Sequence, residues 1–188
     1  VDPIHPRAVA EGGATWADCD HETQVHGLAT PGGLISTTGI GGFTLGGGVG
    51  HLLRKHGLAC DNLLGADIVT ADGELVRASA EENAELFWAL RGGGGNFGVV
   101  TSFELALHQV GPTVLGGAVF SPGDQAAEVV AAWRDAMSDA PDELTSLATL
   151  LTAPPVPFLP EQTHGTKIVG ILACWAGNAE DGEQVLQR

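Results

Sequence analysis

The sequence predicts an α+β fold in two parts that meet near Pro112. Before that residue, short apolar runs of strand type alternate with helical patterns and with dense clusters of glycine. After Gly111 and Pro112 the glycine clusters end, and three strand patterns surround one long amphipathic helix. With 188 residues, the chain is long enough to bury a hydrophobic core.

The first part opens with a strand pattern and a helix signal. Residues 1–10 are predicted to form a strand, so the chain is expected to begin in the middle of a domain. Thr15 and Asp18 resemble a capping box, which starts a helix that stops at Gly27. The apolar spacing of residues 45–56 predicts a short, glycine-rich second helix.

A hairpin, a helix and a further strand follow. Residues 62–79 alternate as two strands joined by an Asp-Gly turn. Ser79 is expected to cap a helix over residues 81–90. Residues 99–110 alternate well enough to form another strand.

The second part is predicted to be simpler, with strands over residues 114–120, 144–151 and 167–175 and helices over residues 123–138 and 178–188. Four prolines mark residues 154–160 as a loop. We therefore expect the beginning of an antiparallel sheet with a helix beside it.

The composition is strongly acidic, with 23 Asp and Glu against 8 Lys and Arg and a formal net charge of -15. Binding a polyanion requires clustered Lys and Arg, so nucleic acid is excluded as a partner. Such a surface suits solubility at high salt, where self-repulsion is screened. A halophilic source is therefore a hypothesis.

The sequence carries no membrane or disulfide signal. No apolar run reaches the roughly 18 residues of a membrane span, and residues 1–7 lack the layout of a signal peptide. The three cysteines are widely spaced and form no CxxC pair, so neither a disulfide framework nor a metal site is predicted at Cys19, Cys60 and Cys174. We expect buried, reduced thiols and a cytoplasmic location.

Glycine is the most unusual feature of the composition. The chain has 28 glycines, roughly twice the usual share of about 7%. Seven lie between Gly39 and Gly50, and five lie between Arg91 and Gly98. Glycines set in apolar sequence let the backbone approach a ligand closely or turn through positive φ.

The usual nucleotide-binding and hydrolase patterns are absent. No lysine follows a glycine, which excludes a P-loop. The GxGxx frames at Gly39, Gly46 and Gly48 do not end on glycine, which argues against a dinucleotide-binding Rossmann site. His21 and His26 are one residue too far apart for an HExxH zinc pair, and no GxSxG elbow is present.

The glycine-rich region instead resembles a known family. The ordered matches are GGATWADCD, PGG at residues 31–33, GIGGFTLGGGVG at 39–50, RKHGLACDN at 54–62 and LFWALRGGGGNFGVVTSF at 86–103. They resemble the second FAD-binding subdomain of the vanillyl-alcohol-oxidase superfamily, in its berberine-bridge-enzyme-like branch. The resemblance implies an FAD-linked oxidase with a PCMH-type FAD-binding domain, its C-terminal part over residues 1–112. Residues 113–188 are then the beginning of a substrate-binding domain, and the N-terminal FAD subdomain lies outside this chain.

The resemblance also implies which residues bind FAD. A run of glycines presents backbone N–H donors to a pyrophosphate without a lysine, and threonine hydroxyls add donors. The implied cofactor-binding residues are Pro31, Gly32, Gly33, Thr37, Thr38, Gly39, Gly41, Gly42, Phe43, Gly46, Gly47, Gly48, Gly50, Asp61, Asn62, Gly98, Val99 and Val100. Asp61 and Asn62 are expected to bond polar flavin or ribityl atoms. Phe87 and Trp88 are expected to lie in a helix core instead.

Departures from the family limit this interpretation. Many members attach FAD through a histidine that would precede Val1, so a histidyl link stays open. Aligning the second, cysteinyl attachment segment places Ile35 at the cysteine and Phe43 at the histidine, which excludes that link and removes a polar contact to the cofactor. The position thought to control oxygen access falls near Thr38, and the choice between oxidase and dehydrogenase stays open.

For the whole protein, the resemblance implies hydride transfer to FAD from an alcohol, amine, sugar or secondary metabolite, while this segment alone is expected to be inactive. The catalytic base is unknown, because relatives take an acidic residue or a tyrosine from the substrate domain and this chain has no tyrosine. His108, Glu104 and Glu161 are better explained as surface or strand residues. A degenerate flavin-binding module and a different FAD enzyme that shares the domain stay open as alternatives. No membrane partner is expected, and the oligomeric state is open.

Overall fold

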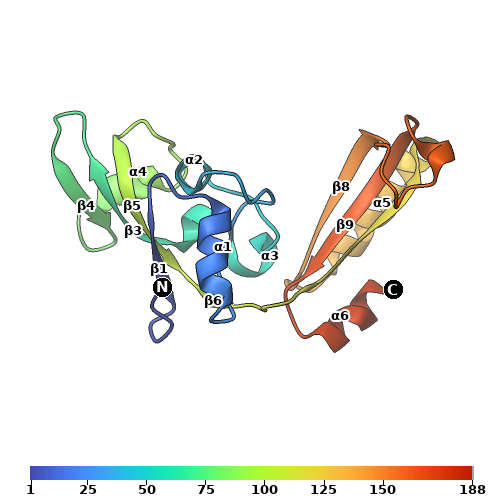
Figure 1. Cartoon of the computed structure of the whole chain (residues 1–188), viewed down its shortest axis with the longest axis horizontal. Helices are drawn as coiled ribbons and strands as arrows, with labels where there is room; N and C mark the ends of the chain where they lie inside the picture. The colour runs from blue at the N-terminus through green and yellow to red at the C-terminus, as the bar shows by residue number, and fades with distance from the viewer. Residues whose placement is uncertain (188) are drawn as a thin grey trace. The chain divides into compact units, whose positions relative to one another are not determined.

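The computed structural model describes residues 1–187 and divides into two compact units, Val1–Thr113 and Val114–Arg188 (Figure 1). Both units combine antiparallel sheet with helices, which confirms the α+β prediction. The assignment of the two units to a flavin domain and a substrate domain stays a prediction. No helix within residues 1–187 is long and apolar enough to cross a membrane.

Unit 1 is built on a four-stranded antiparallel sheet in the order β1-β5-β3-β4, with bounds Arg7–Glu11, Val99–Ala106, Leu63–Val69 and Leu75–Ser79. The hairpin of β3 and β4 confirms the predicted Asp-Gly turn, in which Gly73 has φ 81°. The strand predicted to reach Val110 breaks after Ala106, and β6 (His108–Gln109) pairs with β2 (Leu28–Ala29) instead.

The helices of unit 1 are α1 (Trp16–Gln24), α2 (Ile40–Leu45), α3 (Leu53–His56) and α4 (Ala84–Leu90), together with the 3-10 turn η1 (Ala59–Asn62). The capping box of α1 is confirmed, since the Asp18 carboxylate accepts the Thr15 N–H at 2.8 Å. Buried side chains of α1, α2 and α4 share one core with the inner face of the sheet, where Phe103 and Ile68 are fully buried. The glycine-rich segments pack against that core.

Two predicted elements of unit 1 are wrong in part. Residues 1–6 form a turn rather than a strand, because the Asp2 side chain accepts the N–H groups of Ile4 and His5. The helix predicted over residues 45–56 is interrupted between α2 and α3, where Gly47 and Gly48 adopt φ values of 108° and 80°. Those values lie outside the helical region.

The helix predicted to start after Ser79 begins later. The Ser79 hydroxyl accepts the N–H groups of Glu81 and Glu82 in a turn, and Asn83 is the residue that precedes α4. Phe87 is buried, as predicted, but Trp88 is 76% exposed. Successive helical side chains point in different directions, so only one of two adjacent aromatic residues can face the core.

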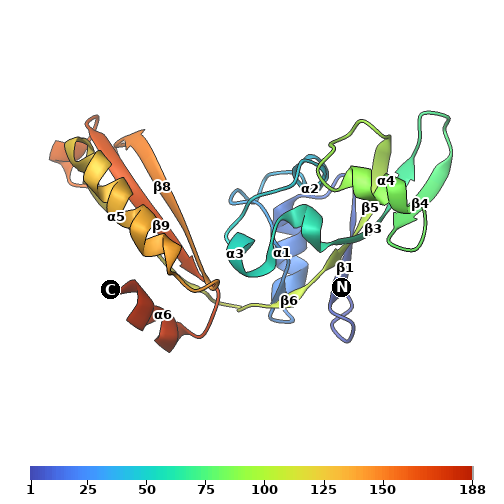
Figure 2. The same ribbon diagram turned by 180° about the vertical axis from the view of Figure 1, so that it is seen from behind.

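Unit 2 is a three-stranded antiparallel sheet in the order β7-β9-β8, with bounds Leu115–Pro122, Lys167–Trp175 and Leu144–Thr152. The turn η2 (Gly123–Gln125) leads into α5 (Ala126–Ser138), which lies along one face of the sheet (Figure 2). There the Trp133 indole N–H donates to the Ser146 hydroxyl at 3.0 Å. The predicted proline-rich loop leads into η3 (Glu161–Thr163), and α6 (Ala179–Leu186) follows β9. The predicted last helix included Arg188, which lies outside the described residues.

The cysteine prediction is confirmed in its structural part. Cys19, Cys60 and Cys174 are all buried, and none forms a disulfide. Burial raises the pKa of the Cys19 thiol to about 11 and also raises the pKa of Cys60. Both groups are therefore neutral thiols near neutral pH and are poor nucleophiles.

Candidate functional site

The glycine-rich segments predicted to bind a cofactor meet at one place in unit 1. A Cβ atom at Gly50 would overlap the carbonyl oxygen of Gly32, so these two loops touch through bare backbone. The Ala59 N–H donates to the Gly48 carbonyl at 3.0 Å, and the Cys60 N–H donates to the Gly47 carbonyl at 2.9 Å. The Pro-Gly-Gly loop, the run after α2 and the η1 turn therefore form one continuous surface.

The loop between Gly33 and Gly39 is anchored to the beginning of α1. The N–H of Trp16 donates to the Thr38 carbonyl at 3.0 Å, and the N–H of Ala17 donates to the Ser36 carbonyl at 2.8 Å. These donors belong to the first turn of a helix, where no intrahelical acceptor is available. The first turn of α1 thus fixes the path of the loop.

Backbone N–H groups along these loops are left without protein acceptors. No described atom accepts a hydrogen bond from the N–H groups of residues 33–37 and 39, and residues 34–37 are exposed. A second run of such N–H groups covers residues 48–51. Concentrated, unpaired backbone donors bind anions such as phosphate without help from a cationic side chain.

Two buried threonines beside these loops have no hydrogen-bond partner for their hydroxyl groups among residues 1–187. Thr30 precedes the Pro-Gly-Gly loop and is 3% exposed, while Thr44 lies in α2 and is fully buried. Leaving a buried hydroxyl unpaired costs about 1–3 kcal/mol, so such groups are uncommon away from functional sites. Neither threonine is predicted from the sequence, because a lone threonine carries no pattern.

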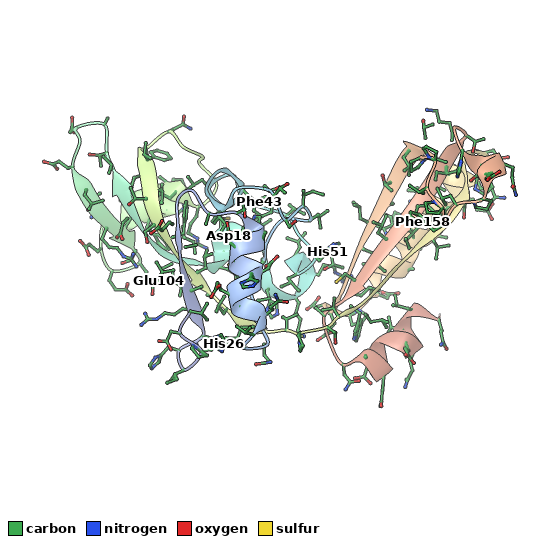
Figure 3. The ribbon with its side chains drawn as sticks, viewed as in Figure 1. Asp18, His26, Phe43, His51, Glu104 and Phe158 are labelled. Atoms are coloured by element: carbon green, nitrogen blue, oxygen red, sulfur yellow. The ribbon has the colours of Figure 1, made fainter. Side chains whose placement is uncertain are left out.

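Phe43, at the position where some relatives of the resembled family have histidine, lies at the N-terminal end of α1 near Asp18 (Figure 3). Its ring meets the ring of Trp16 edge to face, with ring centroids 5.4 Å apart. Hydrogen bonds from Thr15 lower the pKa of Asp18, so this carboxyl group is ionised at neutral pH. The two aromatic rings form an apolar surface against which the glycine loops pack.

Asp61 and Asn62 differ in their availability. The Asn62 amide donates to the carbonyls of His56 and Leu58, both at 2.8 Å, and its Oδ1 lies 2.6 Å from His108 Nε2. Asn62 is therefore committed to holding the loop, and its predicted contact to a cofactor has no free amide hydrogen. Asp61 is exposed, with Oδ1 3.4 Å from Arg91, so its predicted role stays open.

Gly98, Val99 and Val100 lie at the start of β5 and reach the glycine loops only indirectly. The backbone of Gly12 lies between Val100 and Gly41, because a Cβ at Gly12 would overlap the Val100 carbonyl and a Cβ at Gly41 would lie 3.4 Å from the Gly12 carbonyl. The Val100 side chain is buried in the core. The predicted role of this segment stays a prediction.

Two histidines, His56 and His108, stack on each other beside Asn62. The rings of His56 and His108 stack with centroids 3.8 Å apart and planes at 11°. Because both amide hydrogens of Asn62 are used, its Oδ1 faces His108, whose Nε2 must donate. Burial lowers the pKa of His108, so the neutral ring is favoured.

The other polar candidates have structural surroundings. Glu104 pairs with Arg7 at 2.8 Å and with Arg77 on the face of the sheet away from the core, where Figure 3 labels it. Glu161 is exposed in unit 2. Within residues 1–187 no three His, Cys, Asp or Glu side chains cluster as a metal site. None of these residues has the setting of a catalytic base.

The residues of this site fit FAD. The unpaired amides suit its pyrophosphate, the unpartnered hydroxyls of Thr30 and Thr44 lie beside the same loops, and the packing of Gly50 against Gly32 leaves a surface without side chains. The acidic character of the chain does not oppose this fit, because backbone dipoles rather than lysines provide the positive potential.

Comparisons with known proteins agree with this chemistry. Residues 1–79 match a family described as an FAD binding domain. An FAD-linked oxidoreductase of Dictyostelium discoideum is 38% identical over 189 aligned residues, which cover 100% of this chain and 39% of that protein. A (R)-6-hydroxynicotine oxidase of Paenarthrobacter nicotinovorans is 39% identical over 80% of this chain and 30% of its own length.

Solved structures give the same result. The crystal structure of 6-hydroxy-D-nicotine oxidase from Arthrobacter nicotinovorans superposes with a TM-score of 0.85 at 31% identity, over 100% of this chain and 40% of that one. A berberine-bridge-enzyme-like protein of Arabidopsis thaliana gives 0.84 at 29% identity, over 100% and 37%. The allergen Phl p 4, described as a glucose dehydrogenase, gives 0.82 at 27% identity, over 100% and 36%. The chain thus spans about two fifths of the length of these proteins.

The glycine cradle, the match to the FAD binding domain and the full coverage of this chain by these structures agree with one another. The match to the FAD binding domain covers residues 1–79, which lie within unit 1, and FAD is the cofactor of this family. The chain belongs to the FAD-linked oxidoreductases with a PCMH-type FAD-binding domain, in the berberine-bridge-enzyme-like branch.

Proposed function

We propose that this chain supplies much of the FAD-binding surface of an enzyme that transfers hydride from a small organic molecule to the flavin. The observation that carries the proposal is the pair of unpaired amide runs, at residues 33–37 together with 39 and at residues 48–51, on glycine loops that a side chain would block. FAD, when bound, supplies the acceptor for the hydride. The chain's own residues hold and orient it.

Each part of the cradle has a proposed task. The amides of the loop after Gly33 bind the pyrophosphate, and the exposed hydroxyl of Thr37 adds a donor. Glycine at positions 48 and 50 lets the loops pack against Phe43 and Gly32, and the open backbone at Gly42 and Gly47 lets the cofactor approach closely. Asp61 is exposed within η1, and we assign its carboxylate, which also accepts the Leu58 N–H at 3.0 Å, as the acceptor of a hydrogen bond from a ribityl hydroxyl.

For the two parts of the chain, we propose that residues 1–112 are the C-terminal part of the FAD-binding domain and residues 113–188 the beginning of a substrate-binding domain. The support is the one-sided construction of the unit 2 sheet. One face is covered by α5, while the other carries Leu147, 47% exposed, and Phe120, 36% exposed. An antiparallel sheet with exposed apolar side chains on the face away from its helix suits a substrate surface.

The substrate class is kept as wide as an alcohol, amine, sugar or secondary metabolite. The relatives named above include a nicotine oxidase and a glucose dehydrogenase, so similar chains act on unlike molecules. A test is anaerobic mixing of the FAD-loaded whole protein with one compound of each class while the flavin absorption is followed. Loss of the flavin absorption with compounds of one class identifies that class as the substrate. A bound flavin whose absorption no class reduces supports a binding module without catalysis.

Thr38 is the proposed control point for the electron acceptor. Wild-type Phl p 4 is described as a glucose dehydrogenase, and a variant with one isoleucine replaced by valine is described as a glucose oxidase. A single β-branched side chain can therefore decide the acceptor in a similar protein. Replacing Thr38 by Ile is expected to slow reoxidation by oxygen more than reoxidation by an artificial dye, and equal effects on both would contradict this role.

A further inference from the structure

Trp16 contacts the loop that runs from Gly32 to Thr38 through both its backbone and its ring. Its backbone N–H holds the Thr38 carbonyl, as described above, while its fully buried ring lies beneath the Pro-Gly-Gly loop. A Cβ atom added at Gly32 would lie 2.8 Å from Trp16 Cε3. The Trp16 ring therefore occupies the space that a side chain on this loop would need.

The ring of Phe43 extends the apolar surface against which the glycine loops pack. A Cβ at Gly33 would lie 3.2 Å from both Phe43 Cε2 and Trp16 Cδ1, and a Cβ at Gly48 would lie 2.6 Å from Phe43 Cε1. Both rings, whose planes meet at 78°, therefore pack against the first loop, and the Phe43 ring also packs against the second loop. Aromatic pairs in this arrangement have a defined geometry, so they fix the separation of the surfaces they support.

The indole N–H of Trp16 has no hydrogen-bond acceptor in this arrangement. Its Nε1 is buried, has no hydrogen-bond partner among residues 1–187, and would lie 3.4 Å from a Cβ at Gly33. Buried tryptophan N–H groups normally find an acceptor. An unpaired donor directly beneath the loop that carries the unpaired amides points to a group that completes the site.

Resting on the proposed function, we propose that Trp16, together with Phe43, is the positioning residue of the FAD site. The pair holds the two glycine loops at the separation that FAD requires, and FAD binding changes the surroundings of the Trp16 indole N–H. Trp16 acts through the loops rather than on the reacting atoms.

The first test measures FAD affinity in the whole protein that contains this chain. Trp16→Phe is expected to raise the dissociation constant for FAD about tenfold, which corresponds to about 1.4 kcal/mol. Trp88→Phe is the matched control, because Trp88 is 76% exposed and is expected to leave the affinity unchanged. The thermal midpoint of the FAD-free form is recorded for each variant, so that lost affinity is separated from lost folding.

The second test uses shape. Gly33→Ala adds a Cβ against both rings and is expected to weaken FAD binding at least tenfold, and the added change Phe43→Leu is expected to recover most of it by making room. Gly13→Ala is the control, since nothing lies within 4 Å of its Cβ. Recovery by Phe43→Leu is not expected if Gly33 matters only for backbone conformation.

The third readout follows the indole N–H signals by nitrogen-15 NMR with and without FAD. The Trp16 signal, assigned from Trp16→Phe, is expected to move on FAD binding, while that of Trp88 stays in place. A wild-type protein that binds FAD with an unmoved Trp16 signal and unchanged affinity in Trp16→Phe would overturn this inference alone. A wild-type protein that takes up no FAD would overturn the proposed function and this inference with it.

Discussion

The two units use similar elements in opposite ways. In unit 1, side chains from three helices and the sheet form one buried core that includes Trp16, Ile40 and Phe103. In unit 2, α5 has no fully buried residue, and apolar side chains such as Leu147 stay exposed on the face of the sheet away from α5. The difference indicates that a cradle of bare backbone must be rigidly supported, whereas an open sheet face needs less support.

The largest expected contrast comes from removing one aromatic ring in each unit. Phe103→Ala empties space in the core of unit 1 beneath Gly41 and is expected to cost about 3–5 kcal/mol in the free energy of unfolding. Phe158→Ala, at a residue 72% exposed in unit 2, is expected to stay within about 0.5 kcal/mol. Urea titrations followed by circular dichroism measure both, and equal losses would contradict the contrast.

Adding a methyl group to a glycine of each unit sharpens the comparison. Gly50→Ala forces a Cβ onto the Gly32 carbonyl, so the loops must separate at an expected cost of about 1–3 kcal/mol. Gly117→Ala, where nothing lies within 4 Å, is the matched control and is expected to be nearly neutral. Thermal unfolding and FAD retention are measured together, and a Gly50 variant that keeps wild-type values in both would show that the loop contact is dispensable.

A pH effect is expected in unit 1 because of its half-buried His108, which stacks on His56. The folded pKa of His108 lies below its ordinary value of 6.5, so the unfolded chain takes up a proton at a higher pH than the folded chain. The stability is therefore complete above pH 6.5 and falls as the pH drops from 6.5 towards the lowered pKa.

Replacing His108 by Gln, which keeps an N–H donor for Asn62, is expected to reduce this dependence on pH. Replacing the exposed His26, at the other end of α1 in Figure 3, by Gln is expected to leave it unchanged. The measurement is the urea midpoint at pH of about 7.5 and about 5.5. A His108→Gln profile that matches the wild type would assign the acid sensitivity elsewhere.

Salt is expected to have the smallest and least selective effect. Residues 1–113 carry 13 acidic and 5 basic residues, a net -8, while residues 114–188 carry 10 and 3, a net -7 in a shorter segment. Raising the salt from about 0.1 M to about 1 M shortens the screening length from about 10 Å to about 3 Å, which relieves the repulsion. The thermal midpoint is expected to rise, and more so for a signal from unit 2. A midpoint that does not rise would count against the halophilic hypothesis.

The sequence predicted local features well where a single local signal decided them. The hairpin turn at Gly73, the capping box at Asp18 and the strand at residues 167–175 depend on neighbours in the sequence, and the structure confirms them. The glycine runs identified the cradle because they are dense and ordered.

Features that depend on distant contacts were missed. The break in the helix predicted over residues 45–56 follows from contacts of the Gly47 and Gly48 carbonyls with η1, and the outward position of Trp88 follows from the side on which α4 meets the core. Asn62 carried a family signal, yet its amide is used up by carbonyls of the preceding turn. The unpaired groups of Thr30, Thr44 and Trp16 become visible only when the surrounding atoms are placed.

The central claim is that the glycine loops of unit 1 hold FAD. It is tested most directly by the visible absorption spectrum of the purified whole protein, recorded after incubation with FAD and removal of the excess. We predict the absorption of oxidised flavin at a ratio of one flavin per protein. A protein that stays colourless after this treatment would contradict the claim.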